Sequence, residues 1–230
     1  ERTRFSGGSG ALQASGLPRR VAIVSAWAAL SIGALVALIG WGAGLLNGNA
    51  VVILALGTFF GWMYSLRPLA LAWRGWGELV NAALGGVLLP IYGYSVQTDR
   101  VDLLILFASL LFGTLAFLNL LATTWPDREA DAAVGKGTLA TRWSPKRLRL
   151  LYLTCAASYF AVSIVFLRMA ILPPVVAWSS LLVTPLVVWG AAVYTRRRSP
   201  FPSVAAMVGL LVIQSAAWWV YIYLGEAFPI

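Results

Sequence analysis

Seven apolar runs, each about long enough to cross a lipid bilayer, occupy most of the sequence. The hydrocarbon core of a bilayer is about 30 Å thick and an α-helix rises about 1.5 Å per residue, so roughly twenty apolar residues span it. With 60% hydrophobic and 11% charged residues, the chain has more apolar surface than one soluble core of this length can bury. The sequence therefore predicts an all-α integral membrane bundle, a single domain over residues 1–230. Its predicted spans are 21–46, 50–66, 78–96, 102–124, 148–168, 170–193 and 203–224.

Basic residues gather in alternate connections between these runs. Segments 1–20, 67–77, 125–149 and 194–202 hold fifteen of the seventeen Lys and Arg residues, and the opposite side has only Arg100 and Arg168. Loops rich in Lys and Arg stay on the cytoplasmic side of a membrane. We therefore expect a protein of the bacterial inner (plasma) membrane with these four segments in the cytoplasm. The same pattern accounts for the net charge of +9, so the lipid bilayer is the expected partner, with no nucleic acid and no obligate protein partner.

The residue types that are missing narrow the chemistry. The chain has no histidine, and its one cysteine, Cys155, lies inside an apolar run. This excludes His-ligated zinc, Ser-His-Asp triads and Cys-His pairs. No charged residue lies deep in an apolar run, as proton pumps and ion-coupled transporters usually require. Polar chemistry is therefore expected in the loops.

The loop that follows the fourth apolar run carries two carboxylates with a lysine close behind. Asp127 and Asp131 are four residues apart, which on a helix places them on one face, one turn apart. Two such carboxylates can hold Mg²⁺ while water and a diphosphate fill its other positions. Lys136 lies in a Gly-Lys-Gly turn that can bring its ammonium group to phosphate oxygens, whereas Glu129 should point away. A solvated charged loop is the alternative interpretation.

Two further stretches contain candidate anion-binding residues. Tyr64 ends the second apolar run, and Arg67 and Arg74 follow it, so the two guanidinium groups can grip a diphosphate. An aromatic belt with cytoplasmic arginines explains the same pattern. The Gly- and Ser-rich segment 1–20, which includes Arg4, can close over a phosphate or serve as a plain linker.

Together, the three stretches resemble a known family. The UbiA superfamily of membrane prenyltransferases has a second aspartate-rich motif that residues 127–140, DREADAAVGKGTLA, resemble. The resemblance is closest to the form found in 1,4-dihydroxy-2-naphthoate polyprenyltransferases. Residues 64–78 resemble the family's Tyr-containing loop followed by Arg-Gly-x-Gly-Glu, and residues 4–20 resemble the loop after its first aspartate motif. The stretches occur in the family's order and cover about the whole chain.

The chain also departs from the family pattern. The resemblance implies nine helices, of which seven lie here, and places the first motif, Asn-x-x-x-Asp-x-x-x-Asp, before Glu1. Two helices and a metal-binding motif are therefore expected upstream. The family usually has Asn where Thr123 stands, and Asn119 lies one turn earlier as a candidate substrate-binding residue. Where the family commonly has Lys after the loop Tyr, Arg67 or Arg74 must serve.

The resemblance implies transfer of an isoprenoid chain from a prenyl diphosphate to an aromatic acceptor. Asp127 and Asp131 would hold Mg²⁺, and Lys136, Arg67 and Arg74 would stabilise the leaving diphosphate. The predicted acceptor is 1,4-dihydroxy-2-naphthoate, in menaquinone biosynthesis, with 4-hydroxybenzoate and homogentisate as alternatives. Four small residues of the third run are expected to form a slot for the bicyclic ring: Ala82, Ala83, Gly85 and Gly86. From other classes, a non-enzymatic transporter or lipid-binding protein and a seven-helix receptor stay open.

Overall fold

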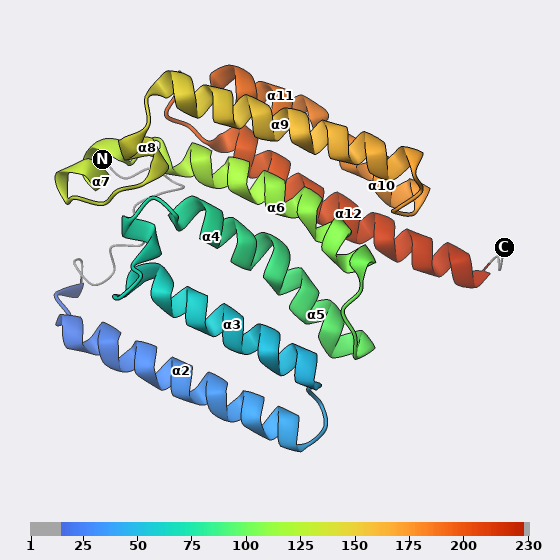
Figure 1. Ribbon diagram of the computed structural model, residues 1–230, viewed down its shortest axis with the longest axis horizontal. Helices are drawn as coiled ribbons and strands as arrows, with labels where there is room; N and C mark the ends of the chain where they lie inside the picture. Colours follow the sequence, from blue (N-terminus) through green and yellow to red (C-terminus); the bar gives the residue numbers. More distant parts are fainter. Residues whose placement is uncertain (1–14, 228–230) are drawn as a thin grey trace.

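The structure is a computed structural model that describes residues 15–227, and within them every regular element is a helix (Figure 1). Prolines, glycines and polar caps divide the chain into these elements. Asn47 and Asp102, for example, accept a hydrogen bond from the first turn of the helix that each precedes. The elements are α2 (Arg19–Gly42), α3 (Gly48–Ser65), η1 (Leu71–Trp73), α4 (Gly77–Ala83), the π-helix η2 (Leu84–Leu88), α5 (Leu89–Thr98), α6 (Leu103–Thr124), α7 (Arg128–Ala133), α8 (Leu139–Arg142), α9 (Pro145–Arg168), α10 (Pro174–Leu181), α11 (Thr184–Val193) and α12 (Phe201–Ala227).

Seven spans in the described part of the chain are long and apolar enough to cross a membrane, which confirms the predicted membrane bundle. Two predicted boundaries were wrong. The first span ends at Gly42 and not at residue 46, because Gly44, at φ +72°, turns the chain before Asn47 caps α3. The sixth begins at Pro174 and not at residue 170, because Pro173 takes the extended cap conformation before α10.

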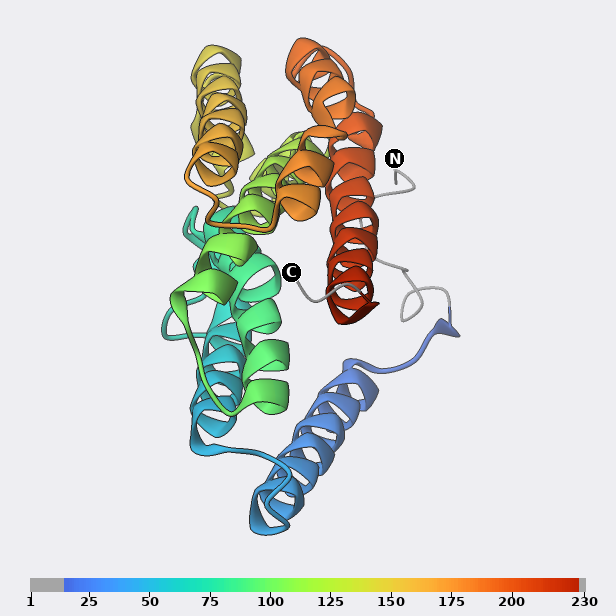
Figure 2. The ribbon, with the colours of Figure 1, turned by 90° about the vertical axis from the view of Figure 1, so that its right-hand side faces the viewer.

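The buried core lies on the C-terminal side of the bundle. Helix α6 packs against α4, η2, α9 and α12, and α12 packs in turn against α10 and α11. Leu115, Tyr152 and Leu210 are among the fully buried core residues. Helix α2, by contrast, has no buried residue in its span and packs mainly against α3. Viewed from the end (Figure 2), the helices form an open arc, with α2 at one end and α12 at the other.

The third span contains a π-helical turn where two backbones approach closely. A Cβ atom on Gly86 would lie 2.6 Å from the Cα atom of Gly113 in α6, so neither helix has room for a side chain at this crossing. Small residues allow this kind of close packing between membrane helices. The π-helix covers Leu84–Leu88 and joins α4 to α5.

The basic connections all lie at one end of the bundle. The segments 66–76, 125–144 and 194–200 lie at the same end as α7 and α8 (Figure 1), and we call this the loop end. Arg100 and Arg168 lie at the opposite end, in the α5–α6 turn and at the end of α9. The predicted segregation of positive charge is therefore present in the fold. Arg4 and the rest of residues 1–14 lie outside the described residues.

Candidate functional site

The two aspartates of the predicted metal motif lie one turn apart at the start of α7. Asp127 takes the N-cap position, and the Asp131 amide donates to its carbonyl oxygen at 2.8 Å. The Asp127 side chain makes no capping hydrogen bond, so its carboxylate is not used by the helix. The side chain of Asp131 is 14% exposed. Both carboxylates are thus partly shielded from solvent.

Lys136 returns to the Asp131 carboxylate across a tight turn. Gly135 has φ +74°, a left-handed conformation that favours glycine, and the amide of Lys136 donates to the carbonyl of Asp131 at 2.8 Å. The Lys136 ammonium nitrogen lies 3.2 Å from both Asp131 carboxylate oxygens. The Lys136 ammonium group and the Asp131 carboxylate are therefore held together on one short segment.

Glu129 lies apart from this pair. Its side chain is 65% exposed and forms ion pairs with Arg128 at 2.9 Å and with Arg198 at 3.4 Å. The Arg128 guanidinium also stacks 4.0 Å from the centroid of the Trp125 ring. Glu129 is therefore bound to surface arginines.

The arginine-bearing loop packs directly against the segment that follows Lys136. The amide of Gly137 donates to the Trp73 carbonyl at 3.1 Å. The Arg142 guanidinium lies over both backbones, since a Cβ atom would fall 3.1 Å from it on Gly75 and 2.6 Å from it on Gly137. Glycine at both positions is what lets the two loops and this arginine meet.

Arg67 and Arg74 line one cavity of about 390 Å³, together with Ser65, Ala70 and Trp73. Both arginines are exposed, and neither side chain has a hydrogen bond or ion pair to any residue in the described range 15–227. Positive charge that the fold does not neutralise therefore surrounds this cavity. An anion is the complementary ligand.

Tyr64 and Asn119 come from helices on either side of α4. The Tyr64 hydroxyl lies against the start of α4, where a Cβ atom on Gly77 would be 3.6 Å away from it. The side-chain carbonyl oxygen of Asn119, in α6, is buried and has no hydrogen-bond partner among the residues that the structure describes. Unpartnered buried oxygens of this kind are uncommon and require a ligand, a water or a functional reason.

Glu78 ends the Arg-Gly-x-Gly-Glu stretch, but the sequence analysis predicted no role for it. It is 2% exposed, and one carboxylate oxygen accepts the Leu139 amide at 2.9 Å, which ties α4 to the first residue of α8. The other oxygen has no partner in the described part of the chain, and Lys136 is among the charges that act on Glu78. The available signal was an acidic residue at the start of an apolar run, because carboxylates inside membrane spans are usually functional.

Tyr194 was also missed. It is 4% exposed, and its ring centroid lies 4.8 Å from that of Tyr152 and 6.3 Å from that of Trp125. Its hydroxyl has no hydrogen-bond partner within the described residues. Burial raises the pKa of Tyr194, and the charge of Glu78 raises that pKa further. No sequence pattern marks Tyr194, since it follows an ordinary apolar run.

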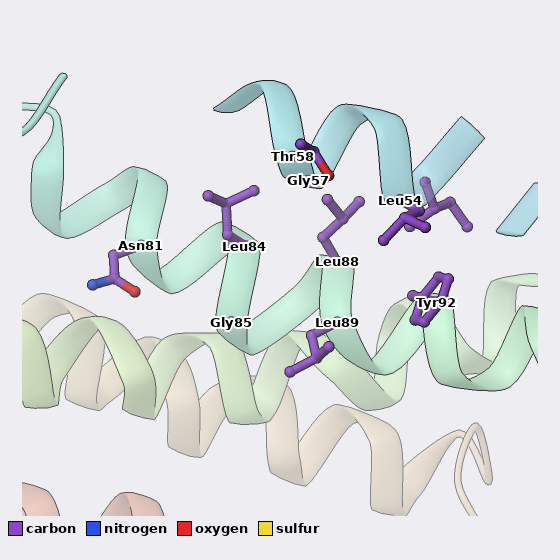
Figure 3. Close-up of a pocket in the computed structure, with 10 residues that line it drawn as sticks. Leu54, Gly57, Thr58, Asn81, Leu84, Gly85, Leu88, Leu89 and Tyr92 are labelled. Atoms are coloured by element: carbon purple, nitrogen blue, oxygen red, sulfur yellow. The ribbon is translucent and has the colours of Figure 1, made fainter. Parts of the chain in front are cut away.

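A larger cavity, of about 470 Å³, lies between α3 and the α4–η2–α5 segment (Figure 3). Its walls are mostly apolar, and Thr58, Asn81 and Tyr92 are the polar side chains that line it. Asn81 lies at the end nearest the start of α4, and Tyr92 lies at the other end. The cavity therefore runs along the third span, away from the loop end.

Of the four small residues predicted to form an acceptor slot, the structure places one in this cavity. Gly85 lines the cavity, but Gly86 packs against Gly113, and Ala82 is 4% exposed, in the helix that packs against α6. Ala83 lines a different, wholly apolar cavity with Leu56 and Phe60. In a membrane helix every face is apolar. Composition alone therefore does not distinguish the face that packs against another helix from the face that lines a cavity.

Asp127 and Asp131 are two carboxylates one helical turn apart, and carboxylate oxygens are ligands that Mg²⁺ takes in proteins. Among residues 15–227, no three His, Cys, Asp or Glu side chains gather closely enough to hold a metal ion by themselves. Magnesium is commonly bound by one or two carboxylates with substrate phosphates and water completing its shell. Asp127 and Asp131 fit that donor set, and the nearby arginines suit the phosphates.

Comparison with known proteins gives one match. The sequence model of the UbiA prenyltransferase family matches residues 14–220. No curated protein and no solved structure shows a significant match to the chain. The matched range covers all seven spans almost completely.

Proposed function

The chain belongs to the UbiA prenyltransferase family, and we propose that it transfers an isoprenoid chain from a prenyl diphosphate to 1,4-dihydroxy-2-naphthoate, which gives a menaquinone precursor. Membership of the family implies prenyl transfer to an aromatic acceptor. The observation that carries the proposal is the packing of the Asp127–Asp131–Lys136 segment against the loop that bears Arg67 and Arg74, through the Gly137–Trp73 hydrogen bond of 3.1 Å. Carboxylates for a metal ion and cations for a diphosphate thereby share one end of the bundle.

Asp127 and Asp131 hold Mg²⁺ in this proposal. Bound there, the ion neutralises charge on the diphosphate and makes it a better leaving group. Lys136 pairs with Asp131 in the free protein, at 3.2 Å. With Asp131 engaged as a metal ligand, the Lys136 ammonium group would be available to bind diphosphate oxygens.

Arg67 and Arg74 bind the diphosphate from the facing loop. Guanidinium groups match phosphate oxygens in pairs, and both groups border the cavity of about 390 Å³. Tyr64, Asn119 and Arg4 complete the proposed contacts, with hydroxyl, amide and guanidinium groups. Cleavage of the allylic C–O bond leaves its electron pair on the diphosphate. The cationic groups of Arg67, Arg74 and Lys136 stabilise the negative charge that develops there.

The isoprenoid lies in the apolar cavity along α3 and α5 (Figure 3). The apolar walls of the cavity exclude water, which would otherwise add to the allylic cation. The electron-rich ring of the acceptor attacks this cation, and the ring proton then passes to an oxygen of the released diphosphate. Asn81 and Thr58 are the polar groups available to orient the acceptor at the cavity wall.

The naphthoate acceptor is proposed on the resemblance of residues 135–140 and 74–78 to naphthoate prenyltransferases. Membranes that contain the full-length protein are given Mg²⁺, a prenyl diphosphate and each of three acceptors in turn. We expect prenylated dihydroxynaphthoate as the main product. Prenylation of 4-hydroxybenzoate or homogentisate, with none of the naphthoate, would disprove the acceptor but keep the prenyltransferase class.

We also propose that the loop end faces the cytoplasm of a bacterial inner membrane, because Lys and Arg concentrate there. Single cysteines are placed in a variant that lacks Cys155, at Lys146 on the loop end and at Val101 on the opposite end. An impermeant thiol reagent added to intact cells should label the cysteine at 101 only. Labelling at 146 from outside would reverse the proposed orientation.

A further inference from the structure

A second cavity at the loop end shares Arg74 with the cavity that Arg67 and Arg74 line, and its other lining residues are different. It has a volume of about 360 Å³, and its walls come from the loop before α4 and from α6, α8 and α9. Neither carboxylate of the α7 pair lines it, nor does Lys136. We call it the Arg–Trp pocket and define it by Arg74, Trp76, Phe117, Arg142, Trp143 and Leu151.

The mouth of the Arg–Trp pocket is positively charged. Arg74 and Arg142 are exposed and line the pocket together, and their side chains have no hydrogen bond or ion pair to any residue of the described chain. None of the described residues that line it is acidic. The Arg142 guanidinium is held over the backbones of Gly75 and Gly137. The pocket therefore presents two cations to an anion, of which Arg142 is packed in place.

The inner wall of the same pocket is apolar and lies at membrane depth. Phe117 precedes the end of its span at Thr124 by about two helical turns, and Leu151 follows the start of its span at Pro145 by a similar distance. At about 1.5 Å per residue, both lie about 10 Å inside the membrane boundary. Trp76 and Trp143 are exposed at that boundary, where tryptophan is enriched in membrane proteins. The ligand must therefore be an amphiphile with an anionic head.

We propose that the Arg–Trp pocket binds one anionic phospholipid of the loop-side leaflet. Its phosphate is bound by Arg74 and Arg142, and one acyl chain lies against Phe117 and Leu151. Basic pockets between membrane helices recognise anionic head groups in this way, and anionic lipids concentrate in the leaflet that faces basic loops. A prenyl diphosphate shares this chemistry, but the pocket has no carboxylate with which to hold its magnesium ion. The lipid proposal shares Arg74 with the proposed diphosphate site, and Arg142 is the cation that belongs to the Arg–Trp pocket and not to the cavity of Arg67.

The test is native mass spectrometry of the full-length protein in neutral detergent, titrated with phosphatidylglycerol or with phosphatidylcholine of the same acyl chains. We expect tighter binding of phosphatidylglycerol. Arg142→Gln should weaken it about fivefold, the factor given by about 1 kcal/mol per arginine near a phosphate. Phosphatidylcholine binding should not change. Arg147→Gln, a matched change of an exposed arginine at the same end of the bundle but outside the pocket, should have no effect.

A second variant and a competitor distinguish the remaining explanations. Leu151→Trp fills the apolar wall, so it should reduce phosphatidylglycerol binding while both arginines stay intact. Inorganic phosphate, which has no acyl chain, should leave the lipid bound. Equal binding of the two lipids, equal loss in Arg147→Gln, no effect of Leu151→Trp, or displacement by inorganic phosphate would overturn the proposal.

Discussion

The two ends of the bundle are formed by the same helices, but their polar groups have different roles. At the opposite end, Asp102 caps its own helix and accepts the Tyr94 hydroxyl, and the Asn47 side chain caps α3 and donates to the carbonyl of Ser95. The hydrogen-bonding capacity of these groups is used in capping helices and in joining the helix ends. At the loop end, Arg67, Arg74 and Arg142 have no ion pair with any described residue, and Glu78 keeps one carboxylate oxygen without a partner. Polar groups that the fold does not need for its own stability are therefore concentrated where we place the chemistry.

The largest expected difference between the ends is in catalysis. Asp131→Ala in the full-length protein removes a proposed metal ligand and should lower the initial rate of Mg²⁺-dependent prenyl transfer about a hundred- to a thousandfold, the usual loss for one electrostatic contact in a transition state. Asp127→Ala should lower the initial rate by a similar factor. Asp102→Ala, the control at the opposite end, should keep the rate. Glu129→Ala should lose little, because Glu129 is bound to Arg128 and Arg198. Equal losses from Asp131→Ala and Glu129→Ala would remove the basis for the carboxylate pair.

The next effect concerns the connection between the two loops. Glu78→Ala leaves the Leu139 amide without its acceptor, which costs about 1–3 kcal/mol for a buried group. The segment that carries Lys136 is then less well held, and we expect kcat to fall about tenfold, as a loss of about 1.4 kcal/mol in positioning would give. Glu78→Gln keeps a side-chain carbonyl oxygen for the amide and should recover most of the rate. If Gln is as poor as Ala, the charge of Glu78 matters and its hydrogen bond does not.

Two neighbouring glycines of η2 allow helix packing and cavity shape to be tested separately. Gly86→Ala puts a Cβ atom 2.6 Å from the Gly113 backbone, so α6 must move, and we expect a loss of about 1–3 kcal/mol in the free energy of unfolding. Gly85→Ala meets no atom within 4 Å and should leave stability nearly unchanged. The measurement is the thermal midpoint of each purified variant in one detergent. A lower midpoint for Gly85→Ala than for Gly86→Ala would contradict the packing described for η2.

The smallest effect is expected at the opposite end and depends on pH. The hydrogen bond from Tyr94 holds the pKa of Asp102 below its ordinary value, so the ionised carboxylate favours the folded state. This stability is present above the ordinary carboxyl pKa and is lost as the pH falls through the lower pKa of the folded state. Asp102→Asn should therefore lower the thermal midpoint slightly at pH 7 and should differ less from the wild type in strong acid. Prenyl transfer at pH 7 should be unaffected, since Asp102 lies at the end away from the proposed site.

The sequence predicts the bundle well because lipid is the solvent for its helices. Hydropathy reports directly whether a segment can cross a membrane, so all seven spans were found and only their ends were displaced. The spacing of Asp127 and Asp131 was equally accessible, since a helical turn is a local property. The contact between Glu78 and Leu139 joins residues 61 positions apart, and no local pattern predicts it. The unpartnered hydroxyl of Tyr194 likewise depends on how α11 packs, which hydropathy does not describe.

The hydrogen bond between Gly137 and Trp73 has a consequence for how the protein is made. Trp73 leaves the ribosome well before Gly137, and α4, α5 and α6 must all enter the membrane between the two events. Until then the loop that bears Arg67 and Arg74 lacks its hydrogen bond to Gly137. A chain that stops after α6 already has four of the seven described spans but none of the α7–α8 segment. Insertion of the first spans into the membrane and completion of the site are therefore separate stages of biogenesis.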